Sequence, residues 1–103
     1  MDRKEQTNKR FSIGQAAKLA QVHPQTLRYY ERMGILKPAR SKGNVRFYNL
    51  SDLEKIKRIR FLTQELGVNL AGVEIIMKLS VQVEQLKQEK EQLERKLQGE
   101  LTE

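Results

Sequence analysis

The segment Gln25–Arg32 (QTLRYYER) carries two arginines, a glutamine and a tyrosine pair at spacings that suit one helix. If Leu27 and Tyr30 face the interior, the outward side chains are Gln25, Arg28, Tyr29 and Arg32. Arginine can donate two hydrogen bonds to a guanine edge or a phosphate, glutamine can pair with adenine, and a tyrosine hydroxyl can donate to phosphate. The segment predicts a helix that binds nucleic acid, although alone it would also suit a solvated surface.

A second basic cluster follows in Pro38–Tyr48. Ser41–Asn44 is rich in turn residues, and the residues after it alternate with the period of a strand, so we expect a small β-hairpin. Its candidate contact residues are Arg40, Lys42, Arg46 and Tyr48. Two neighbouring basic elements favour a nucleic-acid interface over a solvated surface. Of the two aromatic pairs, we expect Tyr30 and Phe47 to be buried and Tyr29 and Tyr48 to be partly exposed.

Two short helices should position the first cluster. Ser12 and Gln15 form a capping box for a helix that runs to about Ala20. Pro24 suits the first position of a second helix, which ends near Met33, before Gly34. A tight connection between the two makes a helix-turn-helix, and the hairpin after it makes a wing.

Two longer helices are predicted after the hairpin. Ser51–Glu54 reads as a capping box that opens the first, and Gly67 ends it. Its inward residues are expected to be Leu53, Ile56, Ile59, Leu62 and Leu66. Asn69 caps the last helix, which continues into a heptad pattern with Lys90 as a polar residue in the apolar seam. The seam residues are Leu79, Val83, Leu86, Lys90, Leu93 and Leu97. The narrow stripe favours a coiled-coil homodimer over a helix folded back on its own body.

Composition excludes several classes of protein. The chain has 103 residues, no cysteine, one histidine and a net charge of +7. Without cysteine there is no thiolate metal site, disulfide or thiol nucleophile, and His23 alone gives neither a metal cluster nor a catalytic triad. We expect no catalytic residue, metal or cofactor, and therefore no enzyme. No apolar run is long enough for a membrane span, so a cytoplasmic protein is expected.

The positive charge is unevenly distributed along the chain. Residues 81–103 hold four basic and six acidic side chains, a net charge of −2, which leaves +9 for the first 80 residues. The expected organisation is a flexible basic arm at 1–10, a DNA-binding domain at 11–80 and a dimerisation helix at 81–103. The fold class is mainly α, a winged helix-turn-helix with a small hairpin and a C-terminal coiled-coil helix.

Three segments resemble the MerR family of bacterial transcription regulators. They are Phe11–Ala17 (FSIGQAA), Thr26–Leu36 (TLRYYERMGIL) and the hairpin pattern formed by Arg40, Gly43, Arg46 and Tyr48. Within that family, His23–Arg28 (HPQTLR) and Gly67–Val73 (GVNLAGV) are similar to the heat-shock repressor branch, HspR.

The resemblance implies a dimer that binds an inverted repeat in double-stranded DNA. Arg28 and Tyr29 would then make helix contacts and Arg46 the wing contact, with Gln25, Arg40, Lys42 and Tyr48 as secondary contacts. Because the chain stops at the coil and lacks cysteine, repression by occupancy is favoured. The branch implies repression of heat-shock and chaperone genes, with the DnaK chaperone as co-repressor.

Two other functions compete with this interpretation. A coiled-coil adaptor or chaperone-binding module could have a basic body with only non-specific affinity for polyanions. RNA binding would require exposed aromatic residues stacked on a sheet, for which one short hairpin offers too little surface.

Overall fold

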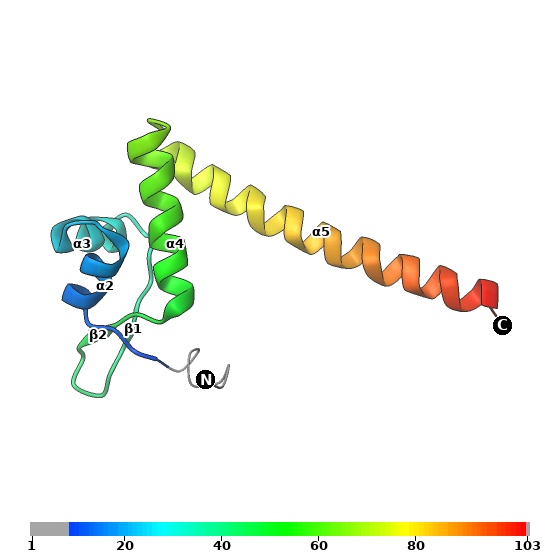
Figure 1. The fold of residues 1–103 in the computed structure, drawn as a ribbon, viewed down its shortest axis with the longest axis horizontal. Coiled ribbons are helices and arrows are strands. Elements are labelled where there is room, and N and C mark those ends of the chain that lie inside the picture. Colours follow the sequence, from blue (N-terminus) through cyan, green and yellow to red (C-terminus); the bar gives the residue numbers. More distant parts are fainter. Residues whose placement is uncertain (1–8, 103) are drawn as a thin grey trace. The chain divides into compact units, whose positions relative to one another are not determined.

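The computed structural model of the chain describes residues 9–102 and divides into two compact units, one ending at Val68 and one beginning at Asn69. The first unit contains α2 (Ile13–Ala20), α3 (Pro24–Arg32), β1 (Ala39–Arg40), β2 (Arg46–Phe47), α4 (Leu50–Arg60) and a π-helical turn η1 (Phe61–Glu65) (Figure 1). The second contains one long helix, α5 (Leu70–Thr102). The predicted arm at 1–10 lies outside the described residues except for its last two.

The two helices of the predicted helix-turn-helix begin and end at the expected signals. The Ser12 hydroxyl accepts a hydrogen bond from the Gln15 amide at 3.1 Å, and the Gln15 side chain accepts one from the Ser12 amide at 2.9 Å, which confirms the capping box. His23 Nδ1 accepts from the Gln25 amide at 3.2 Å, and Pro24 is the first residue of α3. Gly34 has φ = 78°, a left-handed conformation that glycine adopts without a Cβ clash.

The core of the first unit lies where α2 packs against α3 and α4. The inward face of α2 consists of Ala16, Ala17 and Ala20, each no more than 2% exposed. Because these side chains end at Cβ, neighbouring helices can approach closely. The larger buried side chains in this part of the unit are Leu27, Tyr30, Ile35, Leu36, Leu53, Ile56, Ile59 and Leu62.

The hairpin is a two-stranded antiparallel sheet in which Ala39 pairs with Phe47 and Arg40 with Arg46. Just beyond β2, the backbone of Tyr48 exchanges two 2.8 Å hydrogen bonds with that of Phe11. Tyr48 is fully buried, whereas Phe47 is only half-buried. The expectation that Phe47 is core and Tyr48 partly exposed is therefore wrong. Successive strand residues face opposite sides of the hairpin. The side that carries Tyr48 faces the core, and the side that carries Phe47 faces outward.

The predicted start of α4 is displaced by two residues. Asn49 is the N-cap: its side chain accepts from the Asp52 amide at 2.8 Å, and the Asp52 carboxylate accepts from the Asn49 amide at 3.0 Å. Ser51, which the sequence pattern suggested as the cap, lies inside the helix.

A π-helical turn ends this helical segment and changes which residues face the core. The Leu66 amide donates to the Phe61 carbonyl at 3.2 Å, a five-residue step that is wider than an α-helical turn. Leu62 stays buried, but Leu66 is 59% exposed, so the prediction that Leu66 faces inward is wrong. Gly67 ends the segment with φ = 69°, as expected.

The second unit is one continuous helix. The Asn69 side chain accepts from the Gly72 amide at 2.8 Å, as the predicted cap requires. The helix spans 33 residues, or about 50 Å, and the predicted domain boundary at residue 80 falls inside it. Residues 81–101 are exposed throughout. None of the helices between residues 9 and 102 combines the length and apolar character that a bilayer crossing requires.

The cap of α4 leads to a stability prediction. Asn49→Ala should lower the free energy of unfolding by about 1 kcal/mol, because the Asp52 amide loses its acceptor. Urea denaturation followed by near-UV circular dichroism of the three tyrosines reports on the first unit, which contains all of them. Ser51→Ala is the matched control and should change stability by less than about 0.5 kcal/mol. The reverse order of the two effects would restore Ser51 as the cap.

Candidate nucleic-acid interface

The outward face of α3 presents a row of polar side chains. Gln25, Tyr29 and Arg32 are exposed and Arg28 is half-buried, at spacings of three and four residues that place them on one side of the helix. Leu27 and Tyr30, which are buried, anchor the opposite side. The Arg32 guanidinium lies 5.8 Å from the centroid of the Tyr29 ring, within the range of a cation–π contact. This face provides donors for phosphate oxygens and for base edges.

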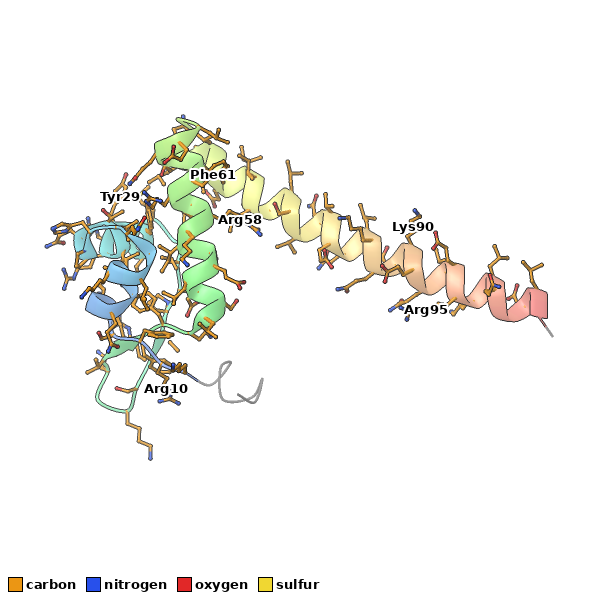
Figure 2. All side chains as sticks on the ribbon, viewed as in Figure 1. Arg10, Tyr29, Arg58, Phe61, Lys90 and Arg95 are labelled. Carbon is orange, nitrogen blue, oxygen red and sulfur yellow. The ribbon has the colours of Figure 1, made fainter. Side chains whose placement is uncertain are left out.

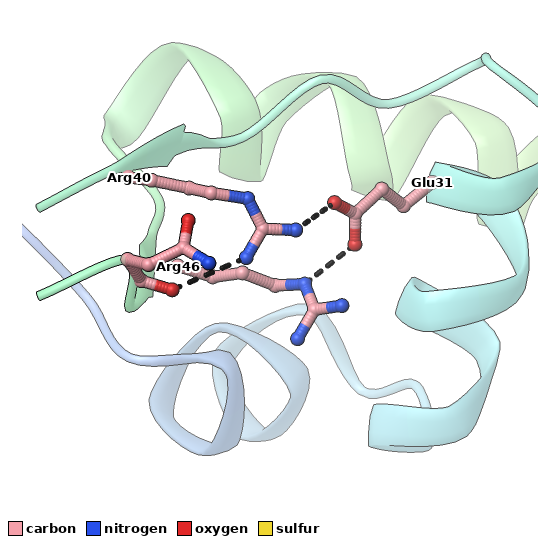
Figure 3. A network of polar contacts seen from close by, with 4 residues as sticks. Glu31, Arg40 and Arg46 are labelled. Atoms are coloured by element: carbon pink, nitrogen blue, oxygen red, sulfur yellow. Dashed lines mark hydrogen bonds and ion pairs between the residues drawn. The ribbon is translucent and has the colours of Figure 1, made fainter.

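Glu31 connects α3 to the hairpin. One carboxylate oxygen accepts from Arg40 Nη2 at 2.7 Å, and the other accepts from Arg46 Nε at 2.5 Å (Figure 3). Arg40 Nη1 also donates to the Asn44 carbonyl at 3.4 Å, across the turn of the hairpin. The carboxylate thus holds one arginine from each strand and fixes the hairpin against the end of α3.

The ionised form of Glu31 is favoured in the folded protein. Partial burial acts to raise the pKa of its carboxyl, but the hydrogen bond and charge of Arg46, together with those of Arg40, outweigh it and lower the pKa below its ordinary value of 4.5. Both ion pairs are therefore present at neutral pH.

The base of the hairpin carries a further cation. The Arg10 guanidinium lies 4.3 Å from the centroid of the Phe47 ring, and Figure 2 shows Arg10 beside the hairpin. Phe47 itself is half-buried, so part of its ring remains accessible beside this cation. Lys42 lies in the exposed turn between the strands. The hairpin and its flank thus add cations to those of α3 within the same unit.

The structure brings most of the predicted contact residues into one unit but gives two of them a partner. Arg40 and Arg46 are bound to Glu31, with Arg46 using Nε, so that its terminal amino groups make no hydrogen bond within residues 9–102. Tyr48 is enclosed in the core, and burial raises the pKa of its hydroxyl above 10.0. Tyr48 therefore has no surface to offer a ligand.

Sequence reasoning missed Glu31, although a signal was present. It is the only acidic residue between Glu5 and Asp52, in a stretch that holds nine basic ones. A single carboxylate in such a stretch indicates an internal partner for some of those cations. Among residues 9–102 there is also no group of three or more His, Cys, Asp or Glu side chains placed to hold a metal ion.

Comparison with known proteins decides the family. The sequence pattern of MerR HTH family regulatory proteins matches residues 11–80, more than half of the chain. The chain belongs to the MerR family. Within it, α2 and α3 form the helix-turn-helix and the β1–β2 hairpin forms the wing, as predicted, and the family's members are regulators rather than enzymes.

Individual MerR proteins resemble the chain over most of its length. The Streptomyces coelicolor protein HspR, whose name assigns it to the heat-shock proteins, is 39% identical over 92 residues; these cover 89% of this chain and 61% of that protein. The chain thus spans about three fifths of the length of this relative. A Bacillus cereus MerR regulator matches with a TM-score of 0.63 and 25% identity over 86% of this chain and 75% of its own. HiNmlR, a MerR regulator lacking the sensor domain and bound to promoter DNA, shares the fold with a TM-score of 0.65 and 19% identity, covering 86% of this chain and 79% of its own.

The burial of Tyr48 leads to a test of its role. Its hydroxyl makes no hydrogen bond within the described residues, so Tyr48→Phe should leave stability unchanged or raise it by about 1 kcal/mol. Because the raised pKa keeps this hydroxyl protonated in the folded state, the unmodified chain should lose stability as pH rises above 10, and the variant should lose less. Urea denaturation at pH 7 and pH 10.5 measures both effects, with Tyr29→Phe as the exposed control. A clear loss of stability in Tyr48→Phe at pH 7 would reveal a partner for the hydroxyl.

Proposed function

We propose that the chain is a transcriptional regulator that binds double-stranded DNA in a sequence-specific manner. The observation that carries the proposal is the polar face of α3, with Arg28 and Tyr29 at its centre, beside a hairpin that Glu31 holds in place. A helix is the element that fits the major groove, where each base pair presents a distinct pattern of donors and acceptors. HiNmlR, which shares the fold, is bound to promoter DNA, which supports duplex DNA as the ligand.

Helix α3 and the hairpin would contact different parts of the DNA, α3 the bases and the hairpin the backbone. Arg28 and Tyr29, with Gln25 and Arg32 beside them, would contact base edges and nearby phosphates from α3. Arg46 and Lys42 would contact the flanking backbone from the hairpin, with Arg40 in support. Tyr48 is removed from this set because it is buried. RNA recognition is disfavoured because the two-residue strands provide no sheet on which bases could stack.

A homodimer formed through α5 is part of the proposal. The apolar seam residues Leu79, Val83, Leu86, Leu93 and Leu97 are between 50% and 66% exposed. An isolated helix with an uncovered leucine stripe is marginally stable in water, whereas a second copy would cover that stripe. Lys90 and Arg95 project to different sides of the helix (Figure 2). Lys90 Nζ lies 3.6 Å from Glu94 Oε1, and Arg95 Nη2 lies 3.7 Å from Glu91 Oε2, so each cation pairs with a carboxylate of its own helix.

Dimerisation would determine the form of the DNA site. Two identical helix-turn-helix units related by a twofold axis read an inverted repeat, with half-sites spaced by about one helical turn or a multiple of it. Binding as a dimer also doubles the number of neutralised phosphates and steepens the dependence on salt.

Repression of heat-shock and chaperone genes is the proposed regulatory role. Its support is the resemblance to HspR of Streptomyces coelicolor across most of this chain. Repression would follow from occupancy of the promoter, and the DnaK chaperone is the proposed co-repressor through the same resemblance.

An adaptor with non-specific affinity for polyanions is the competing function. Its basis is the exposed stripe of α5, which would suit a partner protein as well as a second copy. Selection of bound sites from a random DNA pool separates the two functions. The regulator should enrich one inverted repeat, whereas the adaptor would enrich no sequence.

The proposed helix contact is tested at Arg28. Arg28→Ala should weaken binding to the selected site by about 1–3 kcal/mol and relax the base preference at one position of each half-site. Fluorescence anisotropy with the selected duplex and a shuffled one measures both effects. Arg95→Ala, which removes an equal charge from α5, is the control and should change affinity little. Wild-type affinity and preference in Arg28→Ala would remove Arg28 from the interface.

The proposed dimer is tested at the seam. Leu86→Asp combined with Leu93→Asp should give monomers in sedimentation velocity, because two buried charges would oppose association. Gln85→Asp combined with Gln92→Asp adds the same charges on the opposite side of the heptad and should leave the dimer intact. A dimer that survives the leucine substitutions would place the interface elsewhere.

A further inference from the structure

Glu31 is an acidic residue placed where a DNA-binding surface would be expected to be basic. Both oxygens of its carboxylate are engaged, one by Arg40 and one by Arg46, and its side chain is only 20% exposed. The two arginines face each other directly across the hairpin. Like charges in that arrangement repel, so the carboxylate between them reduces a local charge of +2 to +1.

A carboxylate and a phosphate offer a guanidinium group the same kind of acceptor. Each presents oxygens that accept charge-assisted hydrogen bonds from arginine, often in pairs. A DNA phosphate that approaches Arg40 Nη2 or Arg46 Nε must therefore compete with Glu31 for that donor, and the same contacts restrict how far the two guanidinium groups can reach. The lowered pKa of the Glu31 carboxyl means that this competitor is charged at neutral pH.

We propose that Glu31 is a specificity-determining residue that restrains Arg40 and Arg46, so that the hairpin contributes little to binding unless α3 is seated at its site. This inference rests on the proposed function. In non-specific binding, electrostatic contacts supply nearly all of the affinity, and two restrained arginines weaken them. In specific binding, the same restraint places the hairpin in register with α3, and the Arg46 terminal amino groups can still donate to phosphate.

Glu31→Gln separates restraint from ordinary structural support. The amide has no charge and only one oxygen, so it cannot hold both arginines. Affinity for a shuffled duplex should rise about threefold to tenfold, and the slope of log affinity against log salt should steepen by about 0.9, the value for one added phosphate contact. With affinity for the selected site unchanged, the ratio of specific to non-specific affinity should fall by the same factor, about threefold to tenfold. Loss of folding alone would weaken binding to both duplexes.

Two variants control for charge and for folding. Glu54→Gln changes the net charge equally from an exposed position on α4 and should raise shuffled-duplex affinity by less than about twofold. Glu31→Asp keeps the charge near the arginines and should keep shuffled-duplex affinity within about twofold of the unmodified chain. Near-UV circular dichroism of the tyrosines confirms that each full-length variant is folded.

The outcomes distinguish this inference from the proposed function. If the unmodified chain binds selected and shuffled duplexes equally, the proposed function fails, and the inference fails with it. If the unmodified chain discriminates and Glu31→Gln discriminates equally well, only the role of Glu31 is overturned. Should Glu31→Gln unfold, Arg46→Gln decides. If Glu31 keeps this arginine out of non-specific binding, shuffled-duplex affinity stays within about twofold of the unmodified chain while binding to the selected site weakens, whereas a severalfold loss of shuffled-duplex affinity overturns the role of Glu31.

Discussion

The close approach of α2 to its neighbours is the constraint on which the first unit depends. Ala16, Ala17 and Ala20 are buried with almost no exposed surface, and each side chain ends at Cβ. Protein interiors are packed at crystal-like density, so a larger residue on this face would displace the helices against it. Because Glu31 on α3 holds both hairpin arginines, such a displacement would be transmitted to the wing. The small side chains of α2 thus help to set where the cationic groups of α3 and the hairpin lie.

The two units differ in how much of their apolar surface is exposed to water. The first encloses its apolar side chains and presents cations, and it carries most of the positive charge of the chain. The second leaves residues 81–101 exposed and has a small negative charge. Its i,i+4 pairs, such as Lys78 with Glu74 at 3.6 Å, are each worth a few tenths of a kcal/mol and cannot stabilise the helix alone. In the proposed dimer, association through the exposed leucine stripe would supply further stability.

Features encoded by neighbouring residues could be predicted, and features decided by distant ones could not. Caps, proline and glycine set most helix ends, because their effects act within one turn. An alternating pattern shows that Phe47 and Tyr48 face opposite sides, but pairing with Phe11 decides which side is buried. Leu66 turned outward because a π-helical turn interrupted the expected period. The contacts of Glu31 span nine and fifteen residues, beyond the reach of any local pattern.

Lys90 has a consequence for how the two helices of the proposed dimer would align. A lysine in an apolar seam costs stability unless the facing residues let its ammonium group reach water or a carboxylate. Its pairing with Glu94 shows that this helix provides such a carboxylate itself. In the proposed dimer, this one polar seam residue would fix the register of the two helices, because a shifted alignment would place apolar seam residues over its ammonium group.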